Sequence, residues 1–137
     1  MIKYVLDPGA YAPERAHEDD AGWDLRTRTP FALFGHSHIA VDTGVHIQIP
    51  RGCVGFVKSK SGLNFARNIT TDGTIDAGYT GSIRVKLYNN GNQDVFFSEG
   101  DKIAQIVIVP IIRDKMIHVA SLEETERGNN GFGSTGR

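Results

Sequence analysis

Short runs of alternating apolar and polar residues, bounded by glycine or proline, are the feature of this sequence that most restricts its fold. Residues 45–49 read Val-His-Ile-Gln-Ile, and residues 83–87 read Ile-Arg-Val-Lys-Leu. A side-chain period of two is typical of a β-strand with one face buried and the other in water. We therefore expect half-buried strands in both places.

The other apolar runs extend this pattern. Residues 2–6 and 53–57 are shorter strand candidates, and residues 103–112 are apolar almost throughout, which predicts a strand buried on both faces. No stretch of ten or more residues has helical periodicity, and the one short helix candidate is 61–67. The sequence thus predicts an all-β fold, a barrel or sandwich of many short strands.

The chain is long enough for one domain, with 137 residues of which 39% are hydrophobic. The apolar pattern stops after Ser121, and four of the last ten residues are glycine. We expect a folded domain at 1–120 and a flexible arm at 121–137.

Charge and hydropathy exclude some functions. A net charge of −1 argues against a nucleic-acid-binding surface, and no apolar run is long enough to span a membrane or to serve as a secretion signal. We expect a cytoplasmic protein, in the host cytoplasm if a virus encodes it. Residues 43–71 contain no acid but include Arg51, Lys58, Lys60 and Arg67, so this segment is suited to meet an anion.

Two segments in the middle of the chain suggest chemistry. Residues 58–62, Lys-Ser-Lys-Ser-Gly, precede the helix candidate and suit a phosphate, although for this motif taken alone a solvated basic loop with a serine cap is the favoured interpretation. Residues 73–81 place Asp76 and Tyr79 between glycines, where a carboxylate can orient a water and a ring can stack on a ligand. The alternative is a plain hairpin whose aspartate bonds its own backbone.

The ends of the chain carry two further candidates. Asp19, Asp20 and Asp24 form an acidic group, but their spacing matches no calcium loop, so a solvated turn is the favoured interpretation. In the arm, Phe132 is an isolated aromatic among glycines, near Arg127. Contacts to a polyanion and one stacked ring can offset the cost of ordering such a segment, and the alternative is a disordered tail without a role.

In combination these segments resemble the trimeric dUTPase family. Its five motifs occur in order as AGWDL at 21–25, KSKSGL at 58–63, GTIDAGYTG at 73–81, GDKIAQ at 100–105 and RGNNGFGSTG at 127–136. The resemblance implies a distorted jelly-roll or β-barrel subunit of the dUTPase-like β-clip type. It also implies a homotrimer with shared active sites, and Mg²⁺-assisted hydrolysis of dUTP to dUMP and pyrophosphate. Such an enzyme limits uracil incorporation into DNA and supplies dUMP for dTMP synthesis.

The resemblance also assigns roles to residues. Asp76 matches the catalytic aspartate that activates the attacking water, and Tyr79 matches the ring beneath the deoxyribose. The backbone of the hairpin at Thr70, Gly73 and Ile75 matches the part that reads uracil. The phosphate contacts correspond to Lys60, Ser61, Gly62 and Gln105. The arm positions that close over the nucleotide correspond to Arg127, Phe132, Gly133, Ser134 and Thr135. No residue is expected to ligate Mg²⁺ directly, because substrate phosphates and water hold it, with Asp24 as a possible outer-shell group.

Two departures and two alternatives accompany this resemblance. Lys60 stands where many family members have arginine, and Gly78 stands where an acid is frequent. A dCTP deaminase is the nearest alternative, but its catalytic glutamate corresponds to Lys86 here, and a lysine cannot make the same proton transfers. A nucleotide-sensing regulatory protein of the same fold is the second alternative.

Overall fold

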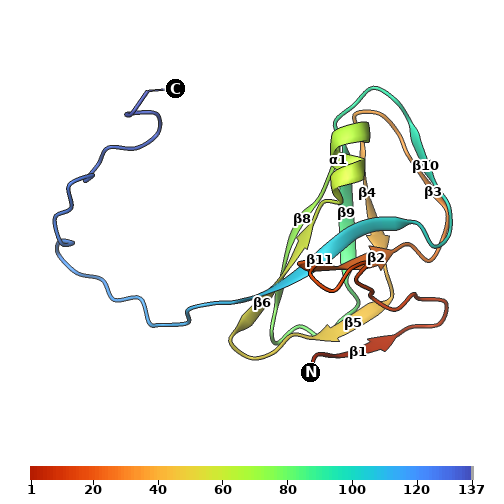
Figure 1. Cartoon of the computed structure of the whole chain (residues 1–137), viewed down its shortest axis with the longest axis horizontal. Coiled ribbons are helices and arrows are strands. Elements are labelled where there is room, and N and C mark those ends of the chain that lie inside the picture. The colour runs from red at the N-terminus through yellow and green to blue at the C-terminus, as the bar shows by residue number, and fades with distance from the viewer. Residues whose placement is uncertain (137) are drawn as a thin grey trace.

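The computed structural model describes residues 1–136, and its regular secondary structure consists of strands and one short helix. Eleven strands and one helix follow one another along this part of the chain (Figure 1). The strands are β1 (Lys3–Leu6), β2 (Gly22–Arg26), β3 (Phe31–Leu33), β4 (His38–Asp42), β5 (Val45–Gln48), β6 (Cys53–Lys58), β7 (Ile69–Thr70), β8 (Asp72–Asp76), β9 (Arg84–Asn89), β10 (Val95–Phe97) and β11 (Lys102–Pro110). The helix is α1 (Ser61–Arg67), between β6 and β7.

The strands form four small sheets, and none of these sheets closes on itself within residues 1–136. The largest has the order β2-β11-β6-β8, and a second has the order β4-β9-β7. Two-stranded sheets of β1 with β5 and of β3 with β10 complete the body, and every strand pair is antiparallel. The predicted all-β, jelly-roll-like class is confirmed, but as packed open sheets and not as a closed barrel.

The core lies between the sheets. Leu25, Val57 and Ile106 contribute from the four-stranded sheet, and Val85 and Leu87 contribute from β9. All five side chains are at most 2% exposed, and each such burial stabilises the fold by about 1.5–3 kcal/mol. The alternation in β9 is strict, with Arg84, Lys86 and Tyr88 on the exposed side.

Most predicted elements are confirmed, and two are wrong. The alternating runs become β5 and β9, and the helix has the predicted bounds. Asp24, which we expected in a solvated turn, lies instead in β2 and is 5% exposed. The strand expected at 103–112 ends at Pro110, and it is not buried on both faces, because only Ile103, Ala104 and Ile106 are buried.

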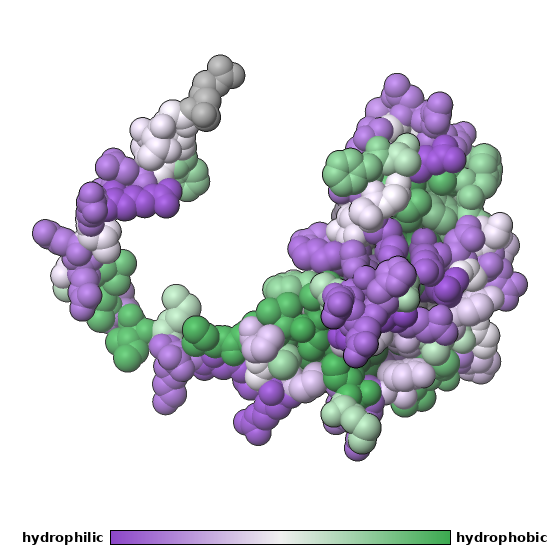
Figure 2. Space-filling view, in the orientation of Figure 1, coloured by the Kyte–Doolittle hydropathy of each residue, from purple (hydrophilic) through white to green (hydrophobic). Residues whose placement is uncertain are grey.

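The chain after β11 leaves the body. Ile111 N–H still donates to Gly52 O (2.9 Å), but residues 112–130 are all exposed and contain no strand. Figure 1 shows this segment swinging away from the sheets, and Figure 2 shows hydrophobic residues along its first part. Within residues 1–136, no helix is long and apolar enough to cross a membrane.

Candidate functional site

A row of polar residues crosses the four-stranded sheet at one end. In register, Asp24 of β2 lies opposite Gln105 of β11, Gln105 lies opposite Lys58 of β6, and Lys58 lies opposite Asp72 of β8. Residues paired in this way point to the same face of a sheet. This face is the outer one, because the next residues along the strands, such as Ile106 and Val57, enter the core. Three of the five sequence motifs therefore meet at this end.

Asp24 is the buried residue at the β2 end of this row. Its carboxylate forms ion pairs with Lys60, which precedes α1, and with Lys102 at the start of β11 (Oδ2–Nζ, 2.9 Å). Burial opposes ionisation of Asp24, but the hydrogen bonds from the two lysines outweigh it and hold its pKa below the usual value. Two ammonium groups on one carboxylate leave a surplus positive charge, which suits an anionic ligand.

The loop before α1 is tied to the same row. Gln105 Nε2 donates to Ser59 O (3.0 Å), while Ser59 Oγ accepts from Thr71 N–H (3.0 Å). Ser61 and Gly62 begin the helix directly after Lys60, and no side chain caps the helix start, so the serine-cap alternative is wrong. The predicted phosphate contacts Lys60, Ser61 and Gly62 therefore lie near Gln105, because Gln105 holds the preceding residue, Ser59, by a hydrogen bond.

β7 and β8 follow one another in the chain but lie in different sheets. β7 pairs with β9, and β8 runs along the edge of the four-stranded sheet from this end to the other. Thr70 lies opposite Tyr88 of β9, and Gly73 and Ile75 lie opposite Val57 and Gly55 of β6. The hydroxyl of Thr71 is the one buried side-chain polar atom without a hydrogen-bond partner in the described chain. The backbone predicted to read a base thus lies mainly in β8, the edge strand of the four-stranded sheet, next to the polar row.

Asp76 ends β8 opposite Val54, and its side chain is exposed. The chain turns there, because Tyr79 N–H donates to Asp76 O (3.0 Å). The phenol of Tyr79 donates to Ser82 O (2.7 Å), and its ring folds over Gly81, where an added Cβ would lie 2.5 Å from the hydroxyl oxygen. A side chain at position 81 would displace the Tyr79 ring, so Gly81 lets this ring lie over the turn that follows Asp76.

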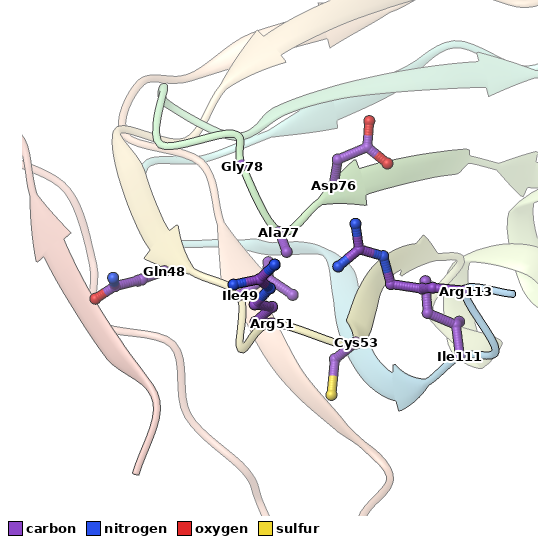
Figure 3. Close-up of a pocket in the computed structure, with 9 residues that line it drawn as sticks. All are labelled: Gln48, Ile49, Arg51, Cys53, Asp76, Ala77, Gly78, Ile111 and Arg113. Atoms are coloured by element: carbon purple, nitrogen blue, oxygen red, sulfur yellow. The ribbon is translucent and has the colours of Figure 1, made fainter. Parts of the chain in front are cut away.

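Asp76 also lines an open hollow of about 510 Å³ at this end of the sheet. Figure 3 shows Arg51 and Arg113 reaching toward Ala77 from two separate segments, with Asp76 on the neighbouring strand. Cys53 lies on the wall of the same hollow. Two guanidinium groups make this end of the sheet positive as well.

The two groups of candidate residues lie at opposite ends of one sheet face. Asp76 is four residues along β8 from Asp72, a separation of about 13 Å in an extended strand. Between the ends the outer face is apolar, with Phe56, Val107 and Val109 half-buried. The fold brings Asp76 together with Tyr79, and Lys60 and Ser61 together with Gln105, but it does not bring the two groups together within one chain.

The arm residues lie apart from both groups. Arg127 Nε donates to Asn130 O (2.7 Å), and Ser134 N–H donates to Gly131 O (3.0 Å), so the arm makes only local turns. Phe132 has a left-handed backbone (φ 50°) and a fully exposed ring. Ser134, Thr135 and Gly133 lie in the same turns, away from the body (Figure 1).

Three residues that the structure places at these sites received no role from the sequence. Lys102 belongs to the fourth motif, but its reach to Asp24 depends on a register shift between Lys102 and Ala104. Arg113 lies beyond the last strand, with no pattern around it. His46 is the polar residue of an alternating strand, yet its ring bonds the turn after Tyr79 (Nδ1 to Thr80 O, 2.8 Å). None of these contacts has a local sequence signal.

Comparison with known proteins gives a consistent result. The dUTPase family model matches residues 9–136. The deoxyuridine 5'-triphosphate nucleotidohydrolase of Tropheryma whipplei is 41% identical, with 100% of this chain and 97% of the relative covered, and that of Clostridium novyi is 43% identical over 93% and 92%. The dUTPase of Staphylococcus bacteriophage 80alpha, solved with dUPNHPP, has a TM-score of 0.95 at 29% identity, covering 100% of this chain and 99% of that one. A mutant dUTPase from Staphylococcus aureus phage phi11, described with a structural Mg(II) ion, has a TM-score of 0.84 at 28% identity, covering 90% and 99%.

Proposed function

Because this chain belongs to the dUTPase family, we propose that it hydrolyses dUTP to dUMP and pyrophosphate, with Asp76 as the catalytic residue. The observation that carries this assignment is the turn that places an exposed carboxylate three residues before a ring held on Gly81. The relatives named above are dUTP nucleotidohydrolases, and the phage 80alpha enzyme was solved with a dUTP analogue. In the cell this reaction limits uracil incorporation into DNA and supplies dUMP for dTMP synthesis.

The reaction needs an oriented water. Asp76 accepts a proton from this water as its oxygen forms a bond to the α-phosphorus, and the bond from that phosphorus to the bridging oxygen breaks to release pyrophosphate. The exposed position of Asp76 leaves its carboxylate accessible to such a water. Tyr79 packs under the deoxyribose, and the backbone at Thr70, Gly73 and Ile75 reads the uracil edge.

The polar row and the start of α1 beside it provide the phosphate contacts. Lys60, Ser61 and Gly62 bind phosphate oxygens with Gln105, and the surplus charge of the two lysines on Asp24 offsets the charge of the triphosphate. Lys60 replaces the planar, two-pronged arginine of many relatives with a point charge. Its ion pair with buried Asp24 restricts where that charge can lie.

The site is completed by a second copy of the chain. Asp76 and the polar row lie at opposite ends of one sheet face, about 13 Å apart, with a half-buried apolar stretch between them. In a three-fold ring each copy contacts the next head to tail, so one end of a sheet meets the other end of its neighbour. A homotrimer formed through this face unites both groups, and the arm residues Arg127, Phe132, Gly133, Ser134 and Thr135 close over the nucleotide.

The side chains of this site fit a magnesium ion that is held by the substrate, and not one that is ligated by the protein. No group of three or more His, Cys, Asp or Glu in residues 1–136 is arranged to ligate a metal, and both carboxylate oxygens of Asp24 already contact lysines. Mg²⁺ bound to phosphate oxygens and water neutralises charge on the triphosphate. Asp24 lies beside the predicted phosphate contacts, so it is the residue that would accept a hydrogen bond from a water on that ion.

Pyrophosphate release from dUTP, dCTP, dTTP and UTP, compared side by side with Mg²⁺, tests this function. We expect strong preference for dUTP, because the backbone of β7 and β8 excludes the thymine methyl and Tyr79 excludes a 2′-hydroxyl. Ammonia release from dCTP would assign the chain to the deaminases instead. That outcome conflicts with the position of Lys86, which is an exposed strand residue with its ammonium 5.4 Å from the ring of Tyr88.

A further inference from the structure

The turn that carries Tyr79 is braced from two sides by residues outside the five motifs. On one side, His46 of β5 contacts Thr80 O through Nδ1 (2.8 Å) and Asp7 Oδ1 through Nε2 (3.0 Å). On the other side, Ser82 Oγ donates to the carboxylate of Asp42 at the end of β4. The brace on the His46 side spans three separate segments, because Asp7 follows β1 and Thr80 follows β8.

The two contacts of His46 are both satisfied as hydrogen bonds in only one protonation state of the ring. A backbone carbonyl and an ionised carboxylate can only accept hydrogen bonds, so both ring nitrogens must donate. A histidine with two N–H groups is the imidazolium cation, and a neutral ring can keep only one of the two bonds. If the neutral ring keeps its bond to Thr80 O, its other nitrogen carries no hydrogen. The lone pair of that nitrogen then faces the carboxylate of Asp7, and the two acceptors repel each other.

We propose that His46, held by Asp7, is a positioning residue that fixes the Tyr79 turn and thereby sets the preference for deoxyribose over ribose. This inference rests on the proposed function, in which the Tyr79 ring lies beneath the sugar. Thr80 is the next residue after Tyr79, so the bond to its carbonyl restrains the backbone that aims the ring. A looser turn leaves room for a 2′-hydroxyl.

The charges around His46 determine how this brace responds to pH. Asp7, which follows β1, and Asp42 of β4 face it, and Arg28 pairs with Asp42 (3.3 Å). Lys3 of β1 lines an open surface hollow together with His46 and Asp7. The hydrogen bond to Thr80 O raises the pKa of His46, desolvation lowers it, and the contacts with Asp7 and Asp42 raise it, with a net rise above 6.5. A raised pKa means that the brace is complete below pH 6.5 and is lost as the pH rises through the folded value.

The test compares His46→Leu, His46→Gln and Asp7→Asn with His17→Gln, an exposed histidine whose ring makes no hydrogen bond in the described chain. Steady-state kinetics with dUTP and UTP from about pH 5.5 to 8.5, a range that spans the titration of a histidine, give the ratio of kcat/KM for the two substrates. We expect His46→Leu to lower this ratio about tenfold, mainly through KM. His46→Gln retains one donor for Thr80 O and restores part of the ratio, and His17→Gln leaves it unchanged.

The pH profile separates positioning from general destabilisation. In the natural chain the dUTP preference falls as the pH rises through the pKa of His46, and in His46→Leu it is flat. Titration of the His46 ring by NMR gives a midpoint above 6.5, and Asp7→Asn lowers that midpoint. An unchanged preference in His46→Leu, or a midpoint at or below 6.5 in the natural chain, overturns the proposal. A chain that does not hydrolyse dUTP contradicts the proposed function instead. The NMR titration then still tests whether His46 holds the turn through Thr80 O and Asp7.

Discussion

Asp24 is a buried carboxylate held by two lysines. It is 5% exposed and pairs with two lysines, so its removal leaves two ammonium groups side by side without a counter-ion. We expect Asp24→Asn to lower the free energy of unfolding by about 1–3 kcal/mol. Urea unfolding at neutral pH measures this loss, with Asp19→Asn, an exposed acid, as the matched control.

The pH dependence of the Asp24 effect follows from its lowered pKa. A carboxyl with a folded pKa below its ordinary value of 3.8 stabilises the chain above that value, and the contribution is lost as the pH falls through the folded value. The stability difference between the natural chain and Asp24→Asn should therefore shrink as the pH is lowered below 3.8. An equal difference at neutral pH and well below 3.8 would show that the ion pairs are not its source.

For Asp76 we expect the opposite: its substitution should have a large effect on the rate of hydrolysis and little effect on stability. Its side chain is exposed at a strand end, and surface substitutions of this kind change the unfolding free energy by about 0.5 kcal/mol or less. Removal of a general base costs about 10²–10⁴-fold in turnover. We expect Asp76→Asn to melt with the natural chain and to release pyrophosphate from dUTP at least about 100-fold more slowly. Wild-type turnover in this variant contradicts the assigned mechanism.

At the level of elements, the arm is the segment whose described residues, 121–136, make no hydrogen bond with the sheets to indicate its role. Residues 112–130 are all exposed, and the arm makes only local turns, so it adds little to the core. We expect truncation after Glu126 to leave thermal melting unchanged and to reduce turnover at least about tenfold, because the role that we propose for the arm is closure over the nucleotide. Full turnover in the truncated chain would remove the arm from the mechanism.

Strands with regular alternation could be predicted from the sequence, and irregular ones could not. β5 and β9 keep a period of two, so their buried faces are visible in the residue order. β2 is short and contains a buried aspartate whose two lysine partners are distant in the chain, so it resembles a solvated turn. In β11 a register shift allows both Ile103 and Ala104 to be buried, and it brings Lys102 to Asp24.

The candidate site divides in the same way. Asp76, Tyr79 and the loop before α1 could be proposed from local composition and from the order of the motifs. Lys102, Arg113 and His46 could not, because their roles depend on contacts with residues that are distant in sequence. A side chain that acts through tertiary contacts leaves no pattern in its own neighbourhood.

For the whole molecule, the central claim is that one catalytic site takes residues from two chains. The four-stranded sheet carries Asp76 at one end and the polar row at the other, about 13 Å apart, and we propose that these are two half-sites. Three chains of 15.0 kDa in a ring give a particle of about 45 kDa, which light scattering measures directly. A monomer with full turnover is incompatible with the shared site.

Co-assembly of two inactive variants tests this claim most directly. Asp76→Asn lacks the catalytic carboxylate, and the double variant Lys60→Ala with Ser61→Ala lacks phosphate contacts at the other end of the sheet. When equal amounts are unfolded and refolded together, roughly a quarter of the sites in random trimers combine an intact Asp76 with an intact phosphate end. We predict that dUTP hydrolysis returns to about a quarter of the natural rate. A mixture no more active than its two separately refolded components would contradict the shared site.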